Sequence, residues 1–160
     1  MLLRLDDPGI PMKLVFQLSE ELKINPQRVA LAQALTQNFS KPYMGLKGTH
    51  GLFGSLAWWE SIFQGRMPLL SISGIIQRAY VAGQDERGMN NTIDLMLDDG
   101  SVRTVGIYVN DKDDIRLFRH GFRADIVYAL DELKQQPGPD GGVNYSKVAL
   151  EMAVSLQPVG

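Results

Sequence analysis

The sequence predicts an α+β protein in which a helical N-terminal segment precedes a β-rich unit. Before Arg66 the apolar residues recur at helical spacing, and after it several runs alternate apolar and polar residues between turn signals. We therefore expect about three short helices followed by a five-stranded, strongly bent antiparallel sheet or small barrel. The expected organisation is a helical region over 1–65 and a β-rich domain over 66–160, either separate or integrated into one domain.

Three helices are expected in the first region. A first helix is expected over 14–22, where four apolar residues share one helical stripe. Asn25 and Pro26 then mark the start of a second helix, with the asparagine as the N-cap and the proline in the first turn. A glycine-containing loop over 40–54 leads to a third expected helix over 55–64, which carries a bulky apolar face.

The second region is expected to be mainly β-structure. Asp98-Asp99-Gly100-Ser101 is a strong hairpin signal, so the runs on either side of it are expected to pair. A polar loop is expected over 83–91 and a short helix over 110–117. The last run alternates strictly and is interpreted as a strand, although its Ala, Glu and Met residues also suit a helix. The five expected strands span 69–82, 92–97, 102–109, 122–130 and 148–156.

This element order, with a long first strand and a short helix before the fourth, is that of an oligonucleotide/oligosaccharide-binding (OB-like) barrel. An SH3-like barrel fits nearly as well. The first and last strands are expected to offer edges for pairing with a partner.

The composition and charge of the chain argue against several classes of function. The 160 residues are 44% apolar and 21% charged, with a net charge of −2, so no global positive field attracts nucleic acid or anionic lipid. The chain has no cysteine, no signal-peptide pattern and no apolar run of the ~20 residues that a membrane span needs. We expect a cytoplasmic protein without cofactor, metal or membrane partner. His50 and His120 do not form a catalytic or metal-binding pattern, so an enzyme is not favoured.

A glycine-rich stretch before the third expected helix is the first candidate site. Its backbone N–H groups and the helix N-terminus suit a phosphate or carboxylate. One alternative function is therefore a small-molecule- or anion-binding protein, or an unrecognised enzyme, that uses this loop over 47–55. The other interpretation is a tightly turned connector between helices. The candidate ligand-binding residues are Lys47, Gly48, Thr49, His50, Gly51 and Ser55.

Aromatic residues on the third expected helix form a candidate interface. Trp58 and Trp59 are adjacent and point about 100° apart on a helix, so they cannot both face one core. One is expected to be buried, and the other, together with Phe63, is a candidate for an interface. The alternative is that both tryptophans pack between the helices and the sheet.

Nucleic-acid binding is a second alternative function, by two routes. Basic and aromatic side chains on the expected sheet could form a binding face, and its candidate residues are Arg78, Tyr80, Arg103, Tyr108 and Arg123. The second route is the helix pair over 18–37, whose residues 18–29 resemble the helix-turn-helix of bacterial regulators. Gln27 and Arg28 suit base reading, but Lys23 replaces the usual turn glycine, so a plain helical hairpin is favoured.

The most favoured function is a non-enzymatic binding or assembly module. The partner is expected to be another protein or a second copy of the chain. This interpretation depends on the tryptophan-rich helix beside the glycine loop, on the expected sheet edges and on the lack of a catalytic grouping.

Overall fold

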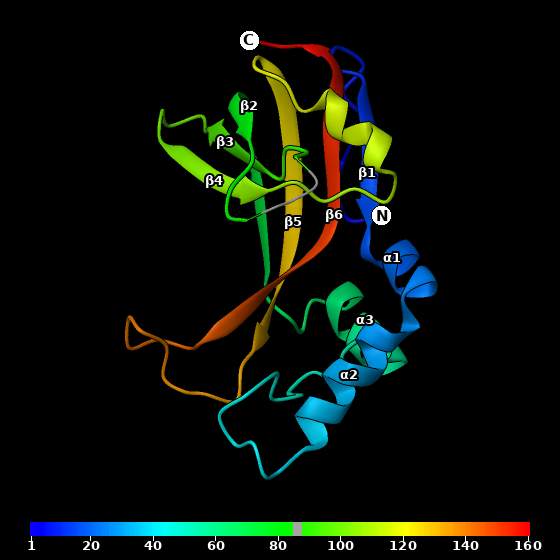
Figure 1. Ribbon diagram of the computed structural model, residues 1–160, viewed down its shortest axis with the longest axis vertical. Helices are drawn as coiled ribbons and strands as arrows, with labels where there is room; N and C mark the ends of the chain where they lie inside the picture. The colour runs from blue at the N-terminus through cyan, green and yellow to red at the C-terminus, as the bar shows by residue number, and fades with distance from the viewer. Residues whose placement is uncertain (85–87) are drawn as a thin grey trace. The chain divides into compact units, whose positions relative to one another are not determined.

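The computed structural model describes residues 1–84 and 88–160 (Figure 1). The expected polar loop over 83–91 therefore lies partly outside the described residues. The elements in chain order are β1 (Met12–Gln17), α1 (Leu18–Ile24), α2 (Pro26–Gln37), α3 (Leu56–Phe63), β2 (Leu69–Tyr80), β3 (Thr92–Met96), β4 (Val102–Gly106), the 3-10 helix η1 (Lys112–Leu117), β5 (Phe122–Glu132) and β6 (Tyr145–Pro158).

The described strands form one open six-stranded sheet in the order β1-β6-β5-β2-β3-β4. The α+β class is confirmed, whereas the expectation of five strands and a barrel fits only roughly. Among the described residues, β1 and β4 lie at opposite edges, so the sheet does not close. Both strands that were expected to offer edges are internal, because the expected first strand, β2, lies between β5 and β3, and the last strand, β6, lies between β1 and β5. That expectation is wrong.

The missed strand is β1, which occupies part of the expected 14–22 helix. A register shift between Leu14 and Phe16 interrupts its pairing with β6, so Val15 and Phe16 are both buried. Such a bulge removes the alternation by which a strand is recognised in a sequence. Helix α1 begins only at Leu18.

Other elements follow their sequence signals. Helix α2 starts at Pro26, and helix α3 is capped by Ser55, whose hydroxyl accepts the N–H of Trp58 at 3.2 Å. The expected hairpin forms between β3 and β4, which pair antiparallel. The final run is a strand, as expected. No helix within residues 1–84 and 88–160 is long and apolar enough to cross a membrane.

The chain packs as two compact units. Unit 1 comprises 1–18, 71–127 and 149–160, and unit 2 comprises 19–70 and 128–148. The expected division between 1–65 and 66–160 stays a prediction.

Unit 1 has its core around β6, because this strand is covered on both faces. Met152 and Val154 lie on one face, where the N–H of Tyr108 points at the Met152 sulfur at 3.4 Å. Glu151 lies on the other, where its carboxylate accepts the N–H groups of Leu2 and Leu3 at 2.8–3.0 Å. The N-terminal residues therefore satisfy a buried carboxylate that would otherwise be costly.

Candidate functional site

The centre of unit 2 is the indole of Trp58 on α3. This side chain is fully buried, and its Nε1–H donates to Oδ2 of Asp131 at 2.9 Å. The Phe53 ring packs edge-on against it, with the ring centroids 5.0 Å apart. Trp58 is thus a core residue and cannot contact a partner directly. It affects an interface only by supporting the residues that pack against it.

Asp131 is a buried carboxyl group that is only half satisfied. It is 1% exposed, and its Oδ1 has no hydrogen-bond partner among the described residues. Burial raises the pKa of Asp131 above its ordinary value, against the smaller opposing effects of the Trp58 hydrogen bond and of His50. The group therefore favours its neutral form more than an exposed aspartate does.

The other two candidate interface residues lie nearer the surface. Trp59 is half-buried, with its ring centroid 4.9 Å from that of Trp58, and Phe63 stacks against Trp59 at 6.3 Å. Phe63 itself is exposed. The side chains form an aromatic row from the core of unit 2 to solvent, so Trp59 and Phe63 stay candidates for an interface.

The glycine-rich loop is fastened to Glu132 at the end of β5. The backbone N–H of Lys47 donates to the Glu132 carbonyl at 2.9 Å, and the Thr49 hydroxyl donates to its Oε2 at 2.9 Å. The Lys47 ammonium lies 3.7 Å from the same oxygen. Two of the predicted anion ligands thus hold a carboxylate of the chain itself.

The rest of this loop has a structural function. The carbonyl of His50 accepts the Ser61 hydroxyl at 3.1 Å, which links the loop to α3. Gly51 has φ +101°, and a Cβ there would lie 3.0 Å from the Trp58 nitrogen, so a side chain would disturb the first turn of α3. An anion at Gly48, Gly51 and Ser55 stays a prediction.

A lysine that sequence analysis missed closes the C-terminal end of α2. The Lys134 ammonium donates to the carbonyls of Leu35, Asn38 and Lys41 at 2.6, 3.3 and 3.1 Å. Each of these carbonyls also accepts a backbone N–H, from Asn38, Lys41 and Met44 respectively, so the ammonium is a second donor to each. A cation at this end of the helix also complements the helix dipole. The segment after α2, drawn in cyan in Figure 1, is thereby linked to the residues that follow β5.

Large apolar side chains on unit 2 remain exposed to solvent. Phe39 and Tyr43, in the loop that Lys134 holds, are 90% and 72% exposed, and Leu31 on α2 is 63% exposed. Met44, Leu56 and Ile24 are also exposed. Of the predicted interface residues only Phe63 belongs to this group. The signal that could have revealed this surface is the absence of Asp and Glu from residues 22–59.

The structure separates the residues of the predicted nucleic-acid face. Arg78 and Tyr80 lie together, with the guanidinium 4.0 Å from the ring centroid, and both bind Asp94, at 2.8 and 3.0 Å. Arg103 pairs with Leu95 in the β3–β4 register, whereas Asp94 pairs with Thr104, so Arg103 points to the opposite face. The hydrogen bond from Arg78 is the main reason that the pKa of Asp94 is lowered.

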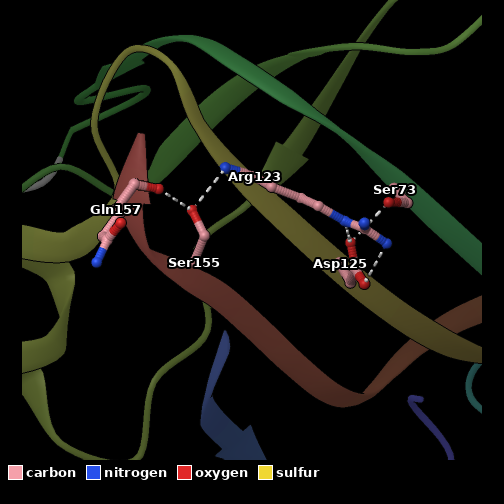
Figure 2. A network of polar contacts seen from close by, with 5 residues as sticks. All are labelled: Ser73, Arg123, Asp125, Ser155 and Gln157. Atoms are coloured by element: carbon pink, nitrogen blue, oxygen red, sulfur yellow. Dashed lines mark hydrogen bonds and ion pairs between the residues drawn. The ribbon is translucent and has the colours of Figure 1, made fainter. Parts of the chain in front are cut away.

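Tyr108 and Arg123 serve packing within unit 1. The Tyr108 ring lies 5.6 Å from that of Phe16. Figure 2 shows Arg123 directed at Asp125, with Nε and Nη2 donating to the two carboxylate oxygens at 2.9 and 3.1 Å. Asp125 also accepts the Ser73 hydroxyl at 2.6 Å. The paired carboxylate offsets the charge of the guanidinium, which weakens its attraction for a phosphate.

The exposed aromatic residues of unit 2 are of the kind that is enriched at protein interfaces. The sequence model of the family described as immunity protein RhsI2 matches residues 12–155, from the start of β1 into β6. The match covers most of the chain, and the chain belongs to this family. No curated protein matches it.

Proposed function

We propose that this chain is an immunity protein that neutralises a toxin protein by binding directly to it. The observation that carries the proposal is the family match over residues 12–155. Protection by binding requires a surface that recognises another protein, and it requires no catalytic group on this chain.

The surface of unit 2 supports a protein partner. Exposed Phe, Tyr and Met side chains are unfavourable in water when they are gathered on one part of a molecule, and such residues are enriched at protein interfaces. Here Phe39, Tyr43, Met44 and Phe63 are all exposed on this unit. Self-association of the chain stays a prediction, which size-exclusion chromatography of the purified chain tests.

The experiment is co-expression with the cognate toxin domain. Cells that express the toxin domain alone should stop growing, and cells that also express this chain should grow. The two proteins, purified together, should elute as one complex at a fixed stoichiometry. Growth without a complex would contradict neutralisation by binding, and failure to restore growth would contradict immunity itself.

A further inference from the structure

The proposed function leaves open which surface the toxin contacts. Resting on that function, we propose that the toxin docks on a surface formed by the outward side of α2 and the loop that follows it, and that its contacting face is apolar with acidic residues at the rim. We call this the α2 surface and define it by Leu31, Ala34, Phe39, Lys41, Tyr43 and Met44, which are all exposed.

The first argument is the composition of helix α2. No residue from Val29 to Gln37 is charged, and apolar residues point both inward and outward. Leu35 packs toward Gly45, whereas Leu31 and Ala34 face solvent. The exposed polar residues Gln27, Arg28 and Gln37 lie toward the two ends of α2, and the exposed residues between them are Ala30, Leu31 and Ala34. A surface helix normally carries charged residues along its whole outer side. The outer side of α2 therefore lacks a covering partner.

The second argument is the charge of the surrounding chain. Residues 22–59 contain four Lys and Arg and no Asp or Glu, although the whole protein has a net charge of −2. Lys23 pairs with Glu20 at 3.0 Å, and Lys47 lies 3.7 Å from Glu132. Within the described part of the chain, Lys41 has no ion-pair partner. It is exposed between Phe39 and Tyr43 in sequence, so a complementary partner places a carboxylate there.

The third argument is that the loop is already ordered for binding. Lys134 fixes the carbonyls of Leu35, Asn38 and Lys41, and the Asn38 side chain accepts the backbone N–H and the hydroxyl of Ser40 at 3.1 and 2.6 Å. A segment held in this way loses little conformational freedom when a partner binds. Exposed aromatic residues on an ordered loop are the usual anchors of a tight interface.

A protein fits this surface better than a nucleic acid. Phosphates would be attracted by the lysines, but Leu31, Ala34 and Met44 offer nothing to a phosphate backbone. An apolar protein face would bury these side chains, and its acidic rim would meet Lys41.

Titration calorimetry of the full chain with the cognate toxin domain tests the proposal. Phe39→Ala and Tyr43→Ala should each weaken binding by about tenfold or more, as expected for central aromatic anchors. Lys41→Glu should weaken binding most at low salt, and its effect should shrink as NaCl is raised, because screening reduces interactions between exposed charges. Thermal unfolding should be nearly unchanged in all three variants, because these side chains are exposed.

Matched controls lie on unit 1. Val102→Ala removes an exposed apolar side chain from β4, and Lys112→Glu reverses an exposed lysine of η1. Both should bind like the wild type. Wild-type affinity in the Phe39 and Tyr43 variants, or a loss confined to the controls, would overturn the α2 surface while leaving the proposed function intact. No binding by the wild-type chain would remove both, and a stable dimer or salt-sensitive DNA binding through these residues would replace the toxin as occupant.

Discussion

Asp131 is a buried carboxyl group with one of its two oxygens bound by the Trp58 indole. Its raised pKa means that the folded protein keeps a proton that the unfolded chain releases as pH rises past the ordinary carboxyl range. The free energy of unfolding therefore decreases with rising pH through the window between the ordinary and the raised pKa. Above that window the carboxyl group is ionised in both states, and the full cost of burying its charge lowers the free energy of unfolding.

We predict that Asp131→Asn becomes progressively more favourable, relative to the wild type, as pH rises through this window. The amide cannot ionise, and its oxygen can still accept the Trp58 N–H. Urea unfolding of both proteins from acidic to neutral pH measures the difference, and Asp6→Asn, at an exposed position, is the control. A difference that does not vary with pH, or that is largest in acid, would contradict the raised pKa.

Within the candidate site, the burial of a tryptophan could be predicted from the sequence, but its hydrogen-bond partner could not. The burial of one tryptophan of the pair follows from helix geometry, and the structure confirms it for Trp58. Its acceptor lies 73 positions away on β5, and nothing local in the sequence marks Asp131 or Lys134 as partners of the helical segment. Contacts at such separations are decided by the tertiary fold.

At the scale of elements, α2 depends on a cation from a different segment. The backbone N–H of Asn38 caps the helix by donating to the Leu35 carbonyl, and Lys134 adds the cation that the last turn of the helix does not contain. The boundaries of α2 and α3 could be predicted from Pro26 and Ser55 because caps are local signals. Strand β1 could not be predicted, because its bulge interrupts the alternation of buried and exposed residues.

We predict that Lys134→Met destabilises the protein by about 1–2 kcal/mol, because three carbonyls lose the charged one of their two donors and the helix dipole loses its cation. The midpoint of urea unfolding gives this value. Lys147→Met, at an exposed position of β6, is the control and should change little. An unchanged midpoint in Lys134→Met would show that the clamp does not stabilise α2.

The strands of unit 1 are joined by the polar network in Figure 2. Ser73 on β2, Arg123 and Asp125 on β5, and Ser155 on β6 form one chain of hydrogen bonds, in which the Ser155 hydroxyl accepts the Arg123 backbone N–H at 3.0 Å. Asp125 is buried and has two donors, so its removal leaves polar groups without an acceptor.

We predict that Asp125→Ala costs about 2 kcal/mol of folding free energy, since the half-buried guanidinium and the Ser73 hydroxyl lose their acceptor. Chemical unfolding measures the loss. Asp98→Ala, at an exposed position of the β3–β4 hairpin, should cost much less. Equal losses in the two variants would show that the network contributes nothing beyond a surface charge.

At the scale of the whole molecule, hydrophobic periodicity predicted the α+β class and the three helices, and the turn residues 98–101 predicted the β3–β4 hairpin. It did not predict the strand order, because pairing between distant strands leaves no local signal. The expected sheet edges show the consequence: β6 is the last strand in the chain, yet it lies between β1 and β5. The aromatic residues of the sequence favoured a binding function. Membership of an immunity protein family identifies a toxin protein as the partner to test.

The most direct test of the account is amide hydrogen exchange of the full chain, free and in complex with the cognate toxin domain. Amides are compared segment by segment in the two states. We predict slower exchange in the complex over α2 and the following loop, residues 26–47, with little change along β4 at the sheet edge. Protection confined to β4 or β1, with α2 and its loop unchanged, would contradict docking on the α2 surface.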